Sequence, residues 1–529
     1  MFDIIIKNGL VADGTRNKAY KADIGIKDGL IAAVEPELSG GAGEVIDAEG
    51  LVVAPGFIDI HSHSDLCPFV PGLKPQSKLY QGVTLEITGN CGMSNLPVND
   101  ATRSMLTDYI SKALELPLHG IMLEDDSITD YVKHIARMPA ATNVGVLIGH
   151  GTLRGCVMGL EMRKPSEAEQ KQMEALLEHE LQNGAFGMSL GLVYPPSSYG
   201  AREELTALAK VLARHGALLT VHLRSESAKV FEAVDEMLDI ARASGVHLEI
   251  SHLKLMGKAQ WGKSGQLLQK IKAARSEGLR VTCDQYPYLA TSTGLSVIVP
   301  KWAMDGGFEA LCARLKNPSA KLKAELAAEL ESRGGAESVL VTSGHGKGSE
   351  FEGKRLSEIM AMYNLSAADA AIKVLVDTDG AASCCYFSLA EEDVENIIKE
   401  DFIAVGTDGY ALSFGKDFMK NSMHPRSFGT FPRYFETIRD KKLLSLEDAV
   451  YKATALAADI LGINNRGRIL QGMAADITVF DYAAIKDKAD YINSAVKPQG
   501  IEYVVIDGKI ALKNGEQVGK NTGRVILYE

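Results

Sequence analysis

Eight short apolar segments alternate with amphipathic, helix-prone segments through the middle of this chain, and no other feature constrains its fold as strongly. Near-continuous apolar runs are typical of parallel strands that helices cover. Eight such strands with helical crossovers predict an α/β fold, the (β/α)8 TIM barrel. The predicted strands span residues 57–61, 83–88, 143–150, 185–193, 217–224, 246–254, 279–288 and 401–408.

The two ends of the chain have a different sequence pattern from the middle. Residues 1–56, and again 466–529, contain short alternating runs separated by NG, DG and GG turn signals, which predict antiparallel strands. A sheet of 56 residues is too small to bury a core alone. We therefore expect both ends to build one small β-sandwich domain beside a barrel domain at 57–465.

The interval 289–400 is too long for one crossover between barrel strands. It contains the helix-prone charged run FEALCARLKNPSAKLKAELAAELESRGG, and we expect an inserted lid segment at about 290–350. A further strand candidate, ASCCYFSLA at 382–390, leaves the identity of the last barrel strands open.

Composition and charge exclude several classes of protein. Hydrophobic residues make up 46% and charged residues 23% of the 529 residues, which is enough for a normal core. A net charge of -12 argues against binding to nucleic acid or to an anionic membrane, because no basic surplus exists. The expected partner is a small molecule. The sequence does not indicate whether the protein is a monomer or an oligomer.

The N-terminal run MFDIIIKNGLVADG is typical of a strand and lacks the features of a signal peptide, and no run of 18 apolar residues occurs. The seven cysteines are an odd number without a CxxC pair, so they predict no disulfide framework. A reducing, cytoplasmic location is expected.

Histidines and one aspartate stand at the ends of predicted strands. His61 and His63 follow the first strand as HSH, and side chains two residues apart leave a strand on the same face. His222, His252 and Asp408 end three later strands. Taken alone, each of these residues is more typical of a structural residue with its hydrogen bonds satisfied inside the fold, or of a turn residue. Together they place five metal-binding side chains at one rim of a barrel, which is typical of an active site.

This order of residues resembles the amidohydrolase superfamily, and the terminal runs NGLVADG and GMAADITVFD resemble its accessory β-sandwich. Many members of that superfamily bridge two metal ions with a carboxylated lysine on the fourth strand. Here the corresponding stretch, GAFGMSLGLVYPP, contains no lysine.

The phrases EITGNCGMS, SLGLVYPP, HLRSES, SHLK, DQYPY and HPRSFGTF resemble the D-aminoacylase branch, the N-acyl-D-amino-acid deacylases. The resemblance covers nearly the whole chain. It implies that the cysteine of EITGNCGMS, Cys91, is a zinc ligand, since a thiolate suits Zn²⁺ where others use a carbamate. The alternative is a free buried cysteine that packs as a small hydrophobe.

The resemblance also implies a ligand set and a mechanism. The tight zinc site would consist of Cys91, His222 and His252. A second, weaker position would be bordered by His61, His63 and Asp408, with Cys91 able to bridge. Activated hydroxide would attack the acyl carbonyl of an N-acyl-D-amino acid while Asp408 carries the proton to the departing amine. Without the second metal, His61 or His63 would stabilise the oxyanion.

A free amino-acid product requires a site for its carboxylate. The candidates are Lys254, Tyr286, Arg426, Ser292 and Tyr194. Structural roles are the alternatives to substrate binding. The lysine could lie at a solvated strand end, the arginine could be a surface charge, and the tyrosines could pack in the barrel.

Substrate specificity is predicted from the segment after DQYPY. Family members that prefer acidic side chains carry an arginine there, whereas this chain reads LSVIVPKWAM. Apolar acyl-amino acids are therefore expected, with Lys301 leaving the acidic option open. His150, at the third strand's end, is expected to support the site and not to bind metal.

Two rival hypotheses share the fold. One is a cyclic-amide hydrolase of the hydantoinase or dihydroorotase type, against which the missing lysine and the presence of Cys91 argue. The other is a non-catalytic scaffold that has lost its metals, against which the retained ligand set argues.

Overall fold

The computed structural model describes residues 1–113, 122–415 and 423–529, and it contains the predicted barrel. Eight parallel strands form one sheet in the order β16-β12-β11-β10-β9-β8-β7-β6. A parallel bridge between Ser62 and Gly409, just beyond the first and last strands, brings the two edges together. The strands are β6 (Phe57–Asp59), β7 (Val83–Thr88), β8 (Asn143–Gly149), β9 (Gly187–Gly191), β10 (Leu218–His222), β11 (His247–Ile250), β12 (Val281–Gln285) and β16 (Ile403–Val405). All eight lie within the predicted segments.

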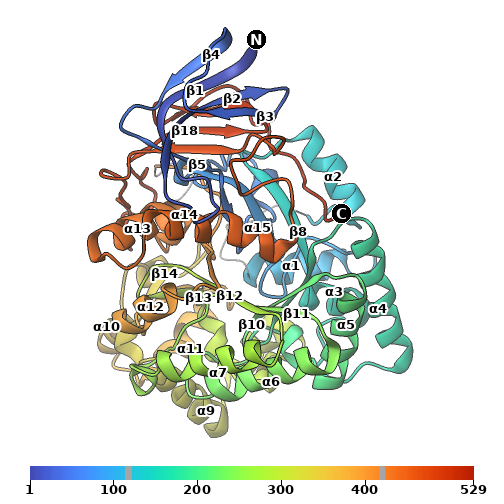
Figure 1. The fold of residues 1–529 in the computed structure, drawn as a ribbon. Helices are drawn as coiled ribbons and strands as arrows, with labels where there is room; N and C mark the ends of the chain where they lie inside the picture. The colour runs from blue at the N-terminus through green and yellow to red at the C-terminus, as the bar shows by residue number, and fades with distance from the viewer. Residues whose placement is uncertain (114–121, 416–422) are drawn as a thin grey trace.

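Helices follow the barrel strands and cover the outside of the sheet (Figure 1). They are α1 (Arg103–Ala113), α2 (Ile128–Arg137), α3 (His150–Met158), α4 (Glu167–Gln182), α5 (Arg202–Arg214), α6 (Val230–Ser244), α7 (Ser264–Ser276), α12 (Glu391–Ile398), α13 (Arg426–Lys441), α14 (Leu446–Ala453) and α15 (Ala455–Leu461). Helix α5 connects β9 to β10 and helix α6 connects β10 to β11, and these three strands pair in parallel.

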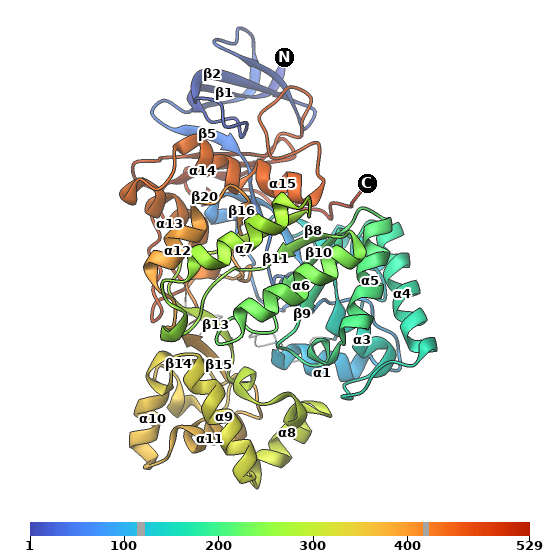
Figure 2. The same ribbon diagram turned by 60° about the horizontal axis from the view of Figure 1, so that its bottom comes forward.

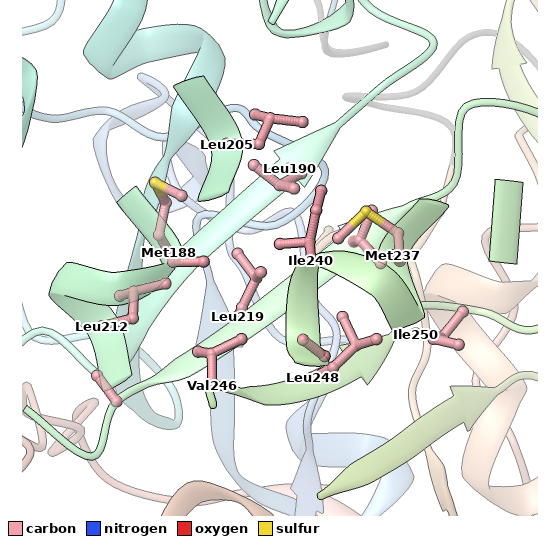
Figure 3. Packing of buried hydrophobic residues seen from close by; sticks show 14 of the residues in the cluster. Met188, Leu190, Leu205, Leu212, Leu219, Met237, Ile240, Val246, Leu248 and Ile250 are labelled. Carbon is pink, nitrogen blue, oxygen red and sulfur yellow. The ribbon is translucent and has the colours of Figure 1, made fainter. Parts of the chain in front are cut away.

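A cluster of buried apolar side chains lies between these strands and their helices (Figure 3). Leu219 and Val221 of β10 alternate with Thr220 and His222, so one face of the strand packs on the helices while the other carries the histidine. Leu219 is completely buried. The hydrophobic face thereby fixes the direction in which His222 points.

Strands from both ends of the chain join in one nine-stranded sheet, which lies at the end of the molecule where the N-terminus is marked (Figure 1). They are β1 (Phe2–Val11), β2 (Tyr20–Lys27), β3 (Leu30–Glu35), β4 (Ala42–Asp47), β5 (Val52–Pro55), β17 (Ile477–Phe480), β18 (Ile501–Ile506), β19 (Lys509–Lys513) and β20 (Glu516–Gln517). The antiparallel pairing of β17 with β5 connects the two ends, as expected. Most pairings in this sheet are antiparallel, as predicted, while β1 pairs in parallel with β4 and β5.

The insertion forms a compact unit on one side of the barrel (Figure 2). Its elements are β13 (Thr291–Gly294), α8 (Gly307–Lys316), α9 (Ala320–Ser332), β14 (Val339–Ser343), α10 (Leu356–Tyr363), α11 (Ala367–Asp377) and β15 (Ser383–Tyr386). Strand β15 pairs with β13 and β14 in a separate three-stranded sheet. The candidate strand at 382–390 therefore belongs to the insertion, which extends beyond the expected limit near residue 350.

Within the described ranges, no single helix has both the length and the apolar character needed to cross a membrane. The bent pair α10 and α11 meets that criterion only when the two helices are taken together.

We predict that Leu219→Ala lowers the free energy of unfolding by about 2–5 kcal/mol, because it leaves a cavity between β10 and its helices. Urea unfolding followed by circular dichroism measures the change. Leu470→Ala is the matched control, since Leu470 is 42% exposed and its loss is expected to change stability little. Equal effects of the two substitutions would contradict the packing described for β10.

Candidate metal centre

The predicted metal ligands come together at the carboxyl ends of the barrel strands, where a barrel builds its active site. Their donor atoms form two overlapping clusters, and within each cluster all donor atoms lie within 4.8 Å of one another. One cluster contains Cys91, His222 and His252, and the other contains His61, His63, Cys91 and Asp408. Because Cys91 belongs to both clusters, its sulfur stands at the centre of the site.

The first cluster has the geometry of a zinc site. Cys91 Sγ lies 3.6 Å from His222 Nδ1 and 3.4 Å from His252 Nε2. Ligands at zinc bond lengths of about 2.0–2.3 Å in a tetrahedron are separated by roughly 3.3–3.8 Å, so these distances leave room for one ion. All three side chains are buried. One thiolate and two imidazoles fit Zn²⁺ and leave one coordination position open.

The second cluster surrounds the same thiol from the other side. His61 Nε2 lies 3.4 Å from Cys91 Sγ and 3.4 Å from Asp408 Oδ1. His63 Nε2 lies 3.1 Å from the same carboxylate oxygen. These contacts can hold a second cation with Cys91 as a bridge, and without one they form a hydrogen-bonded group around Asp408.

Three of these residues have left-handed backbone conformations that are unusual for residues other than glycine: φ is 53° at Cys91, 37° at His252 and 50° at Asp408. Such conformations cost roughly 1–3 kcal/mol each, so the surroundings must hold them in place. The backbone N–H of Asp408 donates to His61 O at 2.8 Å, and that of His252 donates to Asp284 Oδ1 at 2.9 Å.

The turn TGNCGMS brings the thiol to the mouth of the barrel through its glycines. A side chain at Gly89 would place its Cβ 1.9 Å from Leu147 O, and one at Gly92 would place it 2.6 Å from Gly191 N. Both glycines have positive φ, and the Gly92 N–H donates to Ser189 Oγ at 2.9 Å. The tight packing of this turn against β8 and β9 fixes the position of Cys91.

Cys91 is held as a thiolate. Burial alone would raise the pKa of the thiol, but the positive charges of His61 and His252 and hydrogen bonds from His222 and His252 hold it well below its ordinary value. A deprotonated thiol is the form that binds a metal ion.

Asp408 is held as a carboxylate in the same way. Burial would raise its pKa, but the Arg426 guanidinium and the imidazoles of His252 and His63 hold the pKa well below the usual range. Arg426 Nη1 donates to Asp408 Oδ2 at 2.6 Å. The other oxygen, Oδ1, faces His61 and His63.

Two carboxylates that the sequence patterns did not single out lie against the candidate histidine ligands. Glu226 Oε1 lies 2.9 Å from His252 Nδ1, and its Oε2 lies 3.7 Å from His222 Nε2. Asp284 Oδ2 lies 3.0 Å from His61 Nδ1. Each imidazole thus has one nitrogen near Cys91 and the other near an acid, which restricts its rotation. Lys254 Nζ also lies 2.6 Å from His252 Nδ1. Both acids stand in the motifs HLRSES and DQYPY, so their position near strand ends was the available signal.

A small cavity opens beside the candidate metal ligands. All five predicted substrate-binding residues line it, namely Lys254, Tyr286, Arg426, Ser292 and Tyr194. Two of them already have acidic partners, because Lys254 Nζ donates to Glu226 Oε1 at 2.6 Å and Arg426 binds Asp408.

Tyr286 lies between these two cations. Its ring centroid is 5.6 Å from Lys254 Nζ and 5.3 Å from the Arg426 guanidinium carbon. The buried Tyr286 hydroxyl has no hydrogen-bond partner in the described part of the chain. Tyr194, by contrast, shares a hydrogen bond of 2.9 Å with Thr293 Oγ1. The cavity therefore offers a hydroxyl donor flanked by two positive charges.

His150 does not line this cavity. Its Nδ1 lies 2.9 Å from Ser197 Oγ and its Nε2 lies 2.9 Å from Glu204 Oε1. Ser197 in turn accepts from the Gly191 N–H at the end of β9. His150 thus supports the loop after β9 and is not placed to bind a metal at Cys91.

A thiolate, four imidazoles and a carboxylate at the open end of a (β/α)8 barrel define the site of a metal-dependent enzyme. The model of the Amidohydrolase family matches residues 52–511, and the chain belongs to that family.

Known relatives cover almost the full chain. N-acyl-D-glutamate deacylase of Alcaligenes xylosoxydans xylosoxydans is 34% identical over 96% of this chain and 93% of its own length. The crystal structure of N-acyl-D-glutamate deacylase from Bordetella bronchiseptica, complexed with zinc and a phosphonate inhibitor, is 30% identical and covers 99% of both chains with a TM-score of 0.81. A D-aminoacylase structure is 32% identical and covers 100% of both chains with a TM-score of 0.83.

We predict that Cys91→Ala lowers both the zinc content and the activity of the purified protein by tenfold or more, because the loss of a residue that merely orients a metal ligand already costs roughly 10- to 100-fold. Elemental analysis after gel filtration measures the zinc. Cys156→Ala is the control, because Cys156 is also buried but lies outside both clusters. Full zinc content in Cys91→Ala would show that the sulfur is not a ligand.

Proposed function

We propose that this protein is a zinc-dependent N-acyl-D-amino-acid deacylase, which hydrolyses the amide bond and releases a carboxylate and a free D-amino acid. The observation that supports this most strongly is the thiolate of Cys91 between two imidazoles, next to the carboxylate of Asp408 and a cationic cavity. The activity and the D configuration come from the relatives that match the whole chain.

The proposed tight zinc site consists of Cys91, His222 and His252, with a second, weaker position at His61, His63, Cys91 and Asp408. The chemistry that zinc supplies when bound is polarisation of the acyl carbonyl and a lowered pKa for a nearby water.

Asp408 is the proposed proton carrier. Because its pKa is held well below the usual range, it is ionised at neutral pH and accepts the proton of the attacking water. An amide nitrogen leaves only after it is protonated, so Asp408 then donates that proton to the departing amine. The 2.6 Å contact with Arg426 orients the carboxylate for both steps.

His63 is the proposed donor to the oxyanion when the second position is empty. It lines the cavity, and its Nδ1 has no hydrogen-bond partner among the described residues. Burial lowers the pKa of His63, but hydrogen bonds with Asp408 and Cys91 outweigh it and raise the pKa to about 9. The imidazole is therefore protonated at neutral pH and can donate to a developing negative charge.

The substrate α-carboxylate is proposed to bind between Lys254 and Arg426, with the Tyr286 hydroxyl as a further donor. Ser292 and Tyr194 border the same space. Each cation keeps its acidic partner, so the carboxylate would join existing ion pairs and would not have to neutralise an isolated charge.

The cyclic-amide alternative is less well supported. Strand β9, GMSLG, carries no lysine, and among the described residues the one lysine that lines the cavity, Lys254, follows β11. The scaffold alternative predicts a degraded ligand set, whereas the two clusters are complete.

The substrate class is tested with N-acetylated D- and L-amino acids of apolar, neutral polar and acidic type, together with hydantoins, with added zinc and with chelator. We expect cleavage of D-configured linear amides that the chelator abolishes. Cleavage of ring substrates alone would replace this proposal with the cyclic-amide alternative, and inactivity of a zinc-loaded protein on every substrate would favour the scaffold.

We predict that Asp408→Asn lowers kcat roughly 10²- to 10⁴-fold while zinc stays bound at Cys91, because the amide cannot carry the proton. Single-substrate kinetics and elemental analysis on the same preparation separate the two effects. Asp401→Asn is the control, since Asp401 is exposed and lies outside the site. An Asp408→Asn variant with normal kcat would remove Asp408 from the mechanism.

A further inference from the structure

The insertion contributes one cation to the cavity, Arg333. This residue directly follows helix α9, and its backbone N–H still bonds to the last turn of that helix. Gly334 and Gly335 come next with φ of 114° and 76°, which turns the chain away. The Arg333 side chain lines the cavity beside the metal-binding groups, and the residue is only 6% exposed.

The partners of Arg333 leave one side of its guanidinium free. Nε donates to Glu329 Oε1 at 2.8 Å, and the guanidinium carbon lies 5.9 Å from the centroid of the Tyr386 ring. The two terminal nitrogens donate no hydrogen bond to any residue in the described ranges, and the ion pair with Glu329 is made through Nε. The side chain of Glu329 is 39% exposed, so this pair is a partly solvated one.

The other two cations that line the cavity, Lys254 and Arg426, each form a short, buried ion pair. Lys254 is paired with Glu226 at 2.6 Å, and Arg426 is paired with Asp408 at 2.6 Å. Those two cations are sufficient for the single α-carboxylate of the proposed substrate. Arg333 therefore presents the two terminal nitrogens of its guanidinium, which donate no hydrogen bond within the described part of the chain, as N–H donors on a residue that lines the cavity.

A carboxylate is the ligand that fits this fork. The planar guanidinium donates two parallel hydrogen bonds to one carboxylate, a geometry that a neutral side chain cannot match.

Lys301, the residue expected to keep the acidic option open, does not fill this role. It does not line the cavity, and its Nζ donates to Ser198 O at 3.1 Å. Burial lowers the pKa of Lys301 to about 8, which weakens it further as a permanent positive charge. The cation that faces the cavity from the insertion is Arg333.

We propose that Arg333 determines specificity by binding a carboxylate on the substrate side chain, so that the preferred substrates are N-acyl amino acids with an acidic side chain. This inference rests on the proposed deacylase function and replaces the apolar preference expected from the sequence. The insertion, which contributes to the lining of the cavity, then also selects the substrate.

The first test compares two substrates of equal size on the zinc-loaded wild type, N-acetyl-D-glutamate and N-acetyl-D-glutamine. We expect kcat/KM to favour the acid roughly 10- to 100-fold, the range for hydrogen bonds to a charged group. Calorimetry with the products D-glutamate and D-glutamine gives a second readout, with tighter binding of D-glutamate expected. Equal kcat/KM for both substrates would overturn the inference and leave the deacylase function standing.

The second test uses two variants. Arg333→Met is expected to remove the preference for the acid by lowering kcat/KM for N-acetyl-D-glutamate, while N-acetyl-D-glutamine changes less than about threefold. Glu329→Gln removes the negative charge beside Arg333 but keeps the guanidinium and an acceptor for its Nε, and it is expected to retain the preference.

Zinc content of each variant confirms an intact site. A uniform loss on both substrates in Arg333→Met would assign Arg333 a structural role and overturn the inference. If the wild type hydrolyses no N-acyl amino acid at all, the proposed function fails with it, a result distinct from equal rates on the two substrates.

Discussion

The contact between the Cys91 thiolate and the imidazoles around it is the interaction on which the rest of this site depends. Three histidines from three different strand ends lie within 3.6 Å of one buried sulfur. Such a group of polar atoms is stable inside a protein only when its charges are matched, either by protonated imidazoles or by a cation. The left-handed backbone at Cys91, the close packing of Gly89 and Gly92, and the outer carboxylates Glu226 and Asp284 all serve to hold this arrangement in place.

The barrel explains how residues far apart in the chain reach one point. Parallel strands end at the same rim, and the apolar faces of strands such as β10 fix which side chains point to the helices and which to the site (Figure 3). The insertion adds groups from outside this framework (Figure 2). Charge in the cavity is organised in pairs: Lys254 with Glu226, and Arg426 with Asp408. Arg333 is the cation whose terminal donors stay open to a ligand.

Much of this arrangement could be predicted from the sequence, for physical reasons. Covered parallel strands require continuous apolar runs, so all eight barrel strands were recognisable, and metal-binding residues at their ends gave the candidate ligands. The short strand β15 was ambiguous, because its partners β13 and β14 are set by tertiary contacts that no local pattern records. The parallel pairing of β1 was hidden for the same reason. Arg333 was missed because it ends a charged helix far from every motif, where an arginine is ordinarily a surface residue.

X-ray absorption spectroscopy at the zinc edge of the metal-loaded protein tests the central claim most directly. We expect one sulfur at about 2.3 Å together with nitrogen or oxygen ligands at about 2.0–2.2 Å. A first coordination sphere of nitrogen and oxygen alone, with no sulfur, would contradict the assignment of Cys91 and with it the centre described here.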